Sequence, residues 1–280
     1  MNQGSFRSSK EAVLFYAFVI LFVLVSVFPL LWVFKMSIVT KSELFASPPT
    51  ILPETPTGAS YATIFDDPRF QKSLINSTVV AGTTTILCLF FGSIAAYAIA
   101  RLRFRFRSLV MTLILALSFF PHVAIIAPLF LQFRQIGIIN TYWAMIIPDT
   151  VFALPLTIWI LVAFFKELPR DLEDAARVDG ATTVQALRMV ILPLAAPGVF
   201  TAAILTFIYA WNEFLIANTF AFDENTQPVT VTIPNFATIY TVDYGAQAAA
   251  AVVVTVPLVL LVLIFQRWIV SGLTAGAVKG

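Results

Sequence analysis

The chain has 280 residues, of which 59% are hydrophobic and only 11% are charged. Soluble domains carry roughly 25% charged residues, so this composition excludes a soluble globular domain and indicates a polytopic membrane protein. The net charge of +2 is too small to suggest a nucleic-acid partner. The single cysteine, Cys88, and the single histidine, His122, exclude a disulfide framework and a metal site built from these residue types.

Six apolar segments are long enough to cross a membrane. The first apolar run is longer than the core of a signal peptide and no small-residue cleavage site follows it, so we expect no signal peptide. The predicted fold class is an all-α membrane protein with six transmembrane helices, at residues 12–36, 74–100, 108–131, 142–165, 198–219 and 246–269. An N-terminal tail (1–11) and a small-residue C-terminal tail (270–280) flank this region of 12–269.

Two longer connections between the predicted spans are polar. Residues 37–72 are rich in Pro, Ser, Thr and Asp and predict a loop with little regular structure. Residues 221–245 predict a second polar loop. Prolines inside the spans predict bends, and Pro121 and Pro128 are expected to break the third span.

The basic residues indicate the orientation of the chain. Twelve of the seventeen Lys and Arg residues lie on the side of the termini and five on the other side. Cytoplasmic loops carry the excess of Lys and Arg, so both termini are predicted to be cytoplasmic, in a multi-pass plasma-membrane protein. The basic loop 101–107 also alternates with aromatic residues, but a short basic loop between two spans is typical of the cytoplasmic face rather than of nucleic-acid binding.

The segment 166–197, between the fourth and fifth spans, is polar and predicts a helical hairpin. Pro169 favours a first helical turn, which is acidic at Asp171, Glu173 and Asp174, and Gly180 favours its end. Thr182 or Thr183 is expected to cap a second helix, in which Val184, Leu187 and Ile191 recur at helical spacing and which Pro193 ends.

A hairpin of this length is more than a connection between two spans. One alternative is an amphipathic segment that rests on lipid headgroups. Both charge signs flank its apolar residues, whereas anionic lipid favours a Lys- and Arg-rich face, so the composition favours a protein partner.

Within this hairpin, Asp174-Ala175-Ala176, three residues, Gly180, nine residues, Val190, one residue and Leu192-Pro193 resemble the EAA loop of ABC-importer permeases. Asp174 stands where that family usually has Glu, and Val190 where it usually has Ile. Trp211-Asn212-Glu213-Phe214 and the closing segment from Gln266 to Gly280 resemble the MalG-like branch, which imports sugars.

The resemblance implies a permease subunit whose hairpin docks as a coupling helix on a cytoplasmic ABC ATPase dimer. The implied further partners are a second, MalF-like permease, an extracytoplasmic solute-binding protein, a sugar and membrane lipid. The implied coupling residues are Asp174, Ala175, Ala176, Gly180, Leu192 and Pro193, with Gly272 and Lys279 in a tail that threads between ATPase subunits.

No catalytic pattern occurs in the sequence. No stretch matches the phosphate-binding G-x-x-x-x-G-K-[ST], and neither G-x-S-x-G nor H-E-x-x-H is present. We therefore expect a transport subunit and not an enzyme, with no cofactor of its own and with ATP and Mg²⁺ bound by the partner ATPase.

Glu213 lies in the predicted fifth span, where an ionisable side chain costs roughly 2.5–3.5 kcal/mol on insertion scales. With Trp211 and Asn212 it provides an aromatic face and polar groups suited to a sugar, so these three residues are the predicted substrate path. A structural contact between helices is the alternative. Asp149, Gln132 and His122 are weaker candidates.

Two other functions remain open. One is an importer for a non-sugar solute such as a polyol or glycerol phosphate, although the span cores contain no Arg or Lys for a phosphate. The other is an ion-coupled secondary transporter, which predicts inverted repeats that the sequence does not show.

Overall fold

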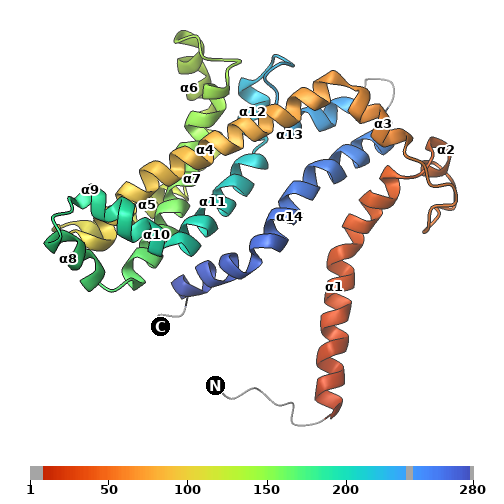
Figure 1. Ribbon diagram of the computed structural model, residues 1–280. Helices are drawn as coiled ribbons and strands as arrows, with labels where there is room; N and C mark the ends of the chain where they lie inside the picture. Colours follow the sequence, from red (N-terminus) through yellow and green to blue (C-terminus); the bar gives the residue numbers. More distant parts are fainter. Residues whose placement is uncertain (1–8, 238–241, 278–280) are drawn as a thin grey trace. The chain divides into compact units, whose positions relative to one another are not determined.

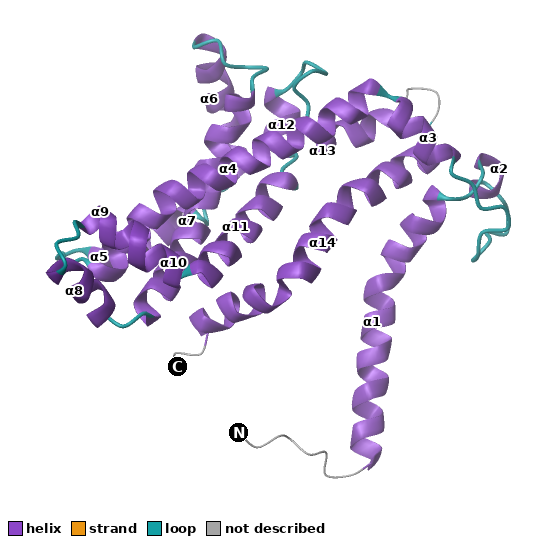
Figure 2. Ribbon diagram, in the orientation of Figure 1, coloured by secondary structure: helices purple, strands orange, loops and turns teal. Residues whose placement is uncertain are grey.

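The computed structural model describes residues 9–237 and 242–277. Nearly all of these residues are helical (Figure 2), and the one extended pairing among them is an isolated antiparallel bridge between Ala237 and Val242. Four helices are long and apolar enough to cross a membrane, or six if each of two bent helix pairs forms one span. The prediction of an all-α membrane protein is confirmed.

The chain divides into two compact units, which we describe separately. The first comprises Met1–Asp67 and Asn235–Val253, and the second comprises Pro68–Pro234 and Val254–Gly280. The second unit contains the predicted hairpin and the three helices that support it.

The first unit contains α1 (Ser9–Ser37), α2 (Lys41–Leu44) and α3 (Ala59–Asp66). The prediction that 37–72 has little regular structure is wrong, because two short helices form there and α4 begins at Pro68. The Glu43 carboxylate organises the segment: it accepts hydrogen bonds from the backbone N–H groups of Glu54 and Thr55 and from the Thr50 hydroxyl.

The core of the second unit is formed by α4 (Pro68–Arg101), α7 (Tyr142–Glu167) and α11 (Ala196–Trp211), which pack side by side (Figure 1). The three helices meet at Thr157 of α7. Its hydroxyl is hydrogen-bonded to that of Thr206 at 2.8 Å, and a Cβ on Gly92 would lie 3.0 Å from its methyl carbon. Small and hydroxyl-bearing residues thus allow close approach of these helices, as is usual in membranes.

The predicted third span consists of two helices, α5 (Arg107–Leu117) and α6 (His122–Gln135), bent by 85°. Pro121 is the N-cap of α6, so its missing N–H coincides with the break. Pro128 lies inside α6 and does not interrupt it, so only one of the two predicted breaks forms.

The predicted fifth span is also interrupted. Helix α11 ends at Trp211, and α12 (Leu215–Phe220) follows after three residues. The next polar loop contains α13 (Val229–Thr232) and the 3₁₀ helix η2 (Ile233–Phe236). Asn76 of α4 fixes the loop, because its amide donates to the carbonyls of Asn225 and Gln227 at 3.0 and 2.9 Å.

The last helix, α14 (Tyr244–Ala277), extends beyond the predicted sixth span. Residues 270–277, predicted from the sequence to belong to the C-terminal tail, continue the helix.

Candidate functional site: a helical hairpin beside an arginine-rich pocket

The predicted hairpin is present, and its turn is built as its sequence indicates. Helix α8 (Asp171–Val178) is followed by Gly180 at φ = 88°, in the left-handed region that favours glycine. The N–H of Ala181 bonds to the carbonyl of Ala176, and that of Gly180 to the carbonyl of Arg177. This pair of bonds is a Schellman motif, which satisfies the last carbonyls of the helix.

The second half of the hairpin begins at α9 (Thr183–Ala186). Thr182 is its N-cap, and a reciprocal capping box joins Thr182 and Gln185. The helix continues as the π-helical turn η1 (Leu187–Ile191) and the short α10 (Leu192–Leu194).

Two of the three predicted apolar contacts of this half are present. Leu187 and Ile191 are buried in the core formed with α4 and α7, whereas Val184 is 72% exposed and does not pack there. The second half of the hairpin ends at Leu194, one residue after Pro193, where the sequence predicted its end. The π-helical turn ends at Ile191, two residues before this proline, which has no N–H with which to continue an α-helical ladder.

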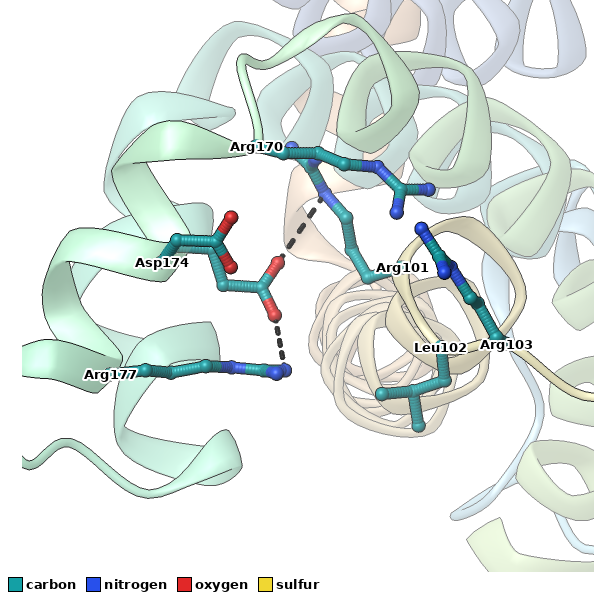
Figure 3. Close-up of a pocket in the computed structure, with 7 residues that line it drawn as sticks. Arg101, Leu102, Arg103, Arg170, Asp174 and Arg177 are labelled. Carbon is teal, nitrogen blue, oxygen red and sulfur yellow. Dashed lines mark hydrogen bonds and ion pairs between the residues drawn. The ribbon is translucent and has the colours of Figure 1, made fainter.

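A polar pocket of about 380 Å³ lies where the hairpin meets the end of α4 (Figure 3). It is lined by Arg101, Leu102, Arg103, Arg170, Glu173, Asp174 and Arg177. Four guanidinium groups and two carboxylates therefore share one small volume, and the positive charges exceed the negative ones.

Glu173 is the centre of this charge cluster. Its carboxylate accepts a hydrogen bond from the Tyr97 hydroxyl at 2.6 Å and one from the Arg177 guanidinium at 2.6 Å. The Nε atom of Arg101 lies 3.8 Å from its second oxygen. The hydrogen bond with Tyr97 and the charge of Glu173 raise the pKa of Arg177, so this arginine stays charged.

The sequence pattern places Glu173 only in the acidic first turn of a helix and gives it no role of its own. A signal was available in part, because Tyr97 and Arg101 are four residues apart and share a face of a helix that ends at the hairpin. The contacting pairs are far apart in the sequence, by 76 positions for Tyr97 and Glu173 and by 67 for Arg101 and Leu168, so local patterns could not predict the contact.

The predicted coupling residues within the hairpin are divided between its first and second halves. Asp174 and Ala175 are exposed on α8, Ala176 is half-buried, and Gly180 forms the turn. Leu192 packs against the core and Pro193 is exposed. Gly272 lies in α14, far along the sequence, and Lys279 lies outside the described residues. The geometry thus brings Asp174, Ala175 and Gly180 together on one short helix and its turn.

The three predicted substrate-path residues lie at the break between α11 and α12. Trp211 is 5% exposed, and its indole N–H has no hydrogen-bond partner among the described residues. The Asn212 amide donates to the carbonyl of Ile208 at 2.7 Å. The Glu213 carboxylate accepts from the N–H groups of Ile216 and Ala217 and so caps α12. Two of the three side chains therefore bond to the neighbouring backbone.

The weaker candidates do not gather into one site. The Asp149 side chain is buried, with one oxygen unpartnered among the described residues, Gln132 is exposed, and His122 packs on the ring of Phe152 at 3.9 Å. The described residues contain no group of three His, Cys, Asp or Glu side chains placed to hold a metal ion.

Solved structures with the same fold are ABC transporters. One chain of a bacterial ABC transporter involved in the import of the acidic polysaccharide alginate superposes with a TM-score of 0.79 at 22% identity, covering 94% of this chain and 99% of that chain. A chain of the inward-facing MetNI methionine ABC transporter gives a TM-score of 0.54 at 18% identity, covering 71% and 94%. At these identities the likeness concerns the fold alone.

Sequence relatives are closer. The chain is 44% identical over 254 residues to the trehalose transport system permease protein SugB of Mycobacterium tuberculosis, covering 90% of this chain and 92% of the relative. It is 43% identical over 257 residues to the sulfoquinovosyl glycerol transport system permease protein SmoH of Agrobacterium fabrum, covering 90% of this chain and 89% of the relative.

The trehalose/maltose permease protein MalG of Thermococcus litoralis is 38% identical over 264 residues, covering 93% and 94%. The family model described as "Binding-protein-dependent transport system inner membrane component" matches residues 88–275, which include the hairpin, the pocket and the break after Trp211. The chain therefore belongs to the family of binding-protein-dependent transport system inner membrane components, as a MalG-like permease.

Proposed function

We propose that this chain is one membrane-spanning subunit of an ATP-driven importer that takes up a disaccharide, a small oligosaccharide or a related glycoside. The observation that carries the proposal is the capped hairpin, which presents Asp174 to solvent beside the charged pocket. A helix that ends in a Schellman motif and a capping box has a fixed shape before any partner arrives, and a fixed shape lowers the entropy cost of docking.

The substrate class is proposed from the relatives. SugB, MalG and SmoH are named for transport of trehalose, of trehalose and maltose, and of sulfoquinovosyl glycerol, which are all small glycosides. Each of these relatives is aligned over about nine tenths of both chains. A glycoside offers hydroxyl groups and apolar ring faces, and a buried indole such as Trp211 suits both.

In this proposal the hairpin docks on a separate cytoplasmic ATPase dimer that binds ATP and Mg²⁺. Asp174 pairs with a basic residue of the ATPase, and the small Ala175 and Ala176 permit close approach. A solute-binding protein delivers the substrate on the opposite face, and a second permease completes the pathway. Both termini, and the hairpin, are cytoplasmic.

The break between α11 and α12 is the proposed substrate path. The indole N–H of Trp211, which has no hydrogen-bond partner in the described part of the chain, lies at this break, and the Asn212 and Glu213 side chains bond to the backbone there. Interrupted helices near the middle of a span are where transporters commonly bind their solutes.

The test is purification of the chain from its native membranes in mild detergent, mass spectrometry of the accompanying proteins, and reconstitution in vesicles. We expect an ATPase, a second permease and a binding protein to co-purify, and labelled trehalose or maltose to enter only when ATP is supplied on the hairpin side. Asp174→Arg is expected to remain in the membrane but to lose transport, with Asp171→Asn, on the exposed start of α8, as the control.

Two outcomes would contradict the proposal. Uptake that persists without ATP and stops when the proton gradient is collapsed would indicate an ion-coupled transporter. ATP-driven uptake of glycerol phosphate or a polyol, with no uptake of any glycoside, would retain the importer and overturn the substrate class.

A further inference from the structure

Helix α8 is attached to the rest of its unit through a charged residue. Glu173 is the one buried residue of α8, with 7% of its side chain exposed. The apolar residues of this helix face solvent: Leu172 is exposed, and Val178 is 87% exposed. The second half of the hairpin differs, because Leu187 and Ile191 bury it in the apolar core.

The partners of Glu173 come from two elements. Tyr97 and Arg101 lie one turn apart at the end of α4, and Arg177 lies one turn along α8 itself. The Tyr97 hydroxyl donates to Glu173 at 2.6 Å, so a neutral donor and a charged group of α4 both contact one carboxylate. Arg101 also donates to the carbonyl of Leu168, the residue that caps α7, at 2.9 Å. The cluster therefore connects α8 to the ends of both α4 and α7.

The ion pair between Arg101 and Glu173 is largely buried. Only 3% of the Arg101 side chain is exposed, and Glu173 is its ion-pair partner in the structure. If Glu173 lost its charge, Arg101 would remain desolvated beside Arg177 with no paired carboxylate. Removing one partner of a buried ion pair destabilises a protein strongly, because the remaining charge stays buried without compensation.

The neighbouring carboxylate, Asp174, has a different environment. Successive residues of an α-helix are about 100° apart around its axis, and Asp174 lines the same pocket as Glu173. Asp174 is exposed and forms no ion pair shorter than 4 Å with the described side chains. The two adjacent acids thus differ in burial and in partners: Glu173 is buried against α4, whereas Asp174 is exposed and remains available to a partner.

We propose that Glu173 is a positioning residue that fastens α8 to the end of α4, so that the two move as one body during transport. The proposal rests on the function proposed above for the hairpin. When the ATPase displaces α8, the Glu173 cluster transmits the displacement to α4, whose packing against α7 and α11 extends it into the membrane region. Without the Glu173 carboxylate, the ATPase still displaces α8, but the displacement is not transmitted to α4.

The functional test compares Glu173→Gln with Glu167→Gln, which removes the same charge at an exposed position at the end of α7. In reconstituted vesicles with the complete complex, we expect Glu173→Gln to keep its ATPase bound. We expect it to transport about tenfold less solute per ATP hydrolysed, within the usual range of coupling between two sites. Glu167→Gln is expected to match the wild type.

A second variant separates positioning from simple instability. In Glu173→Gln/Arg177→Gln the repulsion between Arg101 and Arg177 is relieved, so the transport per ATP should partly recover, whereas an unrelated folding defect would worsen. If Glu173→Gln fails to reach the membrane, Tyr97→Phe removes one hydrogen bond from the same carboxylate and should lower the transport-to-hydrolysis ratio by a smaller factor.

A distance measurement tests the attachment without relying on the ATPase. Spin labels at Asp171→Cys on α8 and Ile94→Cys on α4 occupy exposed positions, and the native Cys88 is fully buried. We expect a single narrow distance distribution in the otherwise unchanged chain and a broad one after Glu173→Gln. Equal distributions in both, narrow or broad, would overturn the proposal. A narrow distribution that broadens, in a protein that binds no ATPase, would instead refute the proposed function alone.

Discussion

The hydroxyl group of Tyr97 lies 2.6 Å from the Glu173 carboxylate, although 76 residues separate the two in the sequence. This contact joins the end of a predicted membrane span to the first helix of the hairpin. Both side chains are largely withdrawn from solvent.

Removing this hydroxyl in Tyr97→Phe should destabilise the second unit by about 1.5–3 kcal/mol, the usual range for a hydrogen bond to a charged group. The ring and its packing remain, so the change isolates the hydrogen bond. Thermal unfolding in detergent measures the effect. Tyr244→Phe, at an exposed ring packed on Phe45, is the control, and an equal shift in both variants would contradict the prediction.

The turn of the hairpin gives a second prediction. A Cβ at Gly180 would meet no atom of the described residues within 4 Å, so the cost of substitution comes from the backbone at φ = 88° and not from a clash. Left-handed backbone costs an L-residue roughly 1–2 kcal/mol, and less for Asn. Gly180→Val should therefore leave the protein in the membrane but lose ATPase co-purification and transport, whereas Gly180→Asn should retain much of both.

If Gly180→Val transports normally with its ATPase still bound, the conformation of this turn is not required for coupling. If Gly180→Asn is as defective as Gly180→Val, the backbone explanation is wrong, because Asn tolerates this conformation best among the non-glycine residues.

Packing between α7 and α11 gives a third prediction. A Cβ at Gly198 would overlap the ring of Phe164. Gly198→Ala should therefore destabilise the unit by about 1–3 kcal/mol, the usual cost of overpacking. Gly82→Ala in α4 is the matched control, since no atom lies within 4 Å of the added carbon. Thermal unfolding should show a loss for Gly198→Ala that Phe164→Leu partly reverses; a lack of reversal would assign the cost elsewhere.

A further prediction distinguishes two roles of Glu213, capping of α12 and direct contact with the solute. As the cap of α12, its loss in Glu213→Ala should reduce stability by about 1 kcal/mol and reduce transport in parallel. Glu213→Gln keeps one acceptor oxygen and should lie between the wild type and Glu213→Ala in both measurements. A raised half-saturating solute concentration with unchanged thermal stability would contradict the capping role and indicate direct contact with the solute.

The stability of the first unit should depend on pH through Glu43. The backbone N–H of Glu54, with smaller contributions from Thr50, Thr55 and Lys35, lowers the pKa of this carboxyl. A pKa that is lower in the folded state stabilises the fold above the unfolded value, about 4.3, and this contribution is lost as the pH falls below it. Proteolytic cleavage within residues 45–57 should therefore accelerate as the pH is lowered through this range.

The matched variant for this measurement is Glu43→Gln. It should be cleaved faster than the wild type at neutral pH and should show much less acceleration in acid. For the Asp243 carboxyl, in the same unit, the effect of burial is outweighed by a contact with Lys41 at 2.7 Å and by backbone hydrogen bonds, which lower its pKa, so a smaller dependence should persist. Acceleration in acid that is identical in both proteins would assign the effect to that pair.

Local sequence signals predicted much of this structure. The apolar lengths predicted α1, α4, α7 and α14, and the hairpin, its glycine turn and the Thr182 cap followed from neighbouring residues. These features depend on contacts within a few positions, where helix caps and turns are determined.

The features that could not be predicted depend on distant residues. The burial of Glu173 requires Tyr97 and Arg101 of another helix. The break after Trp211 depends on the hydrogen bond that the Glu213 carboxylate accepts from the backbone of α12, in place of a contact with a solute or another helix. The helices in 37–72 require the hydrogen bonds of Glu43 to residues up to twelve positions away. Periodicity and composition contain no information on such pairings.

The meeting of three helices at Thr157 has a practical consequence for work with the isolated subunit. Detergent tails have no hydrogen-bonding groups, so they cannot replace the bond between Thr157 and Thr206, and the close approach at Gly92 leaves no space for them to enter. Solubilisation should therefore strip lipid from this three-helix core without separating its helices. The core would then serve as the rigid reference against which movements of the hairpin are measured.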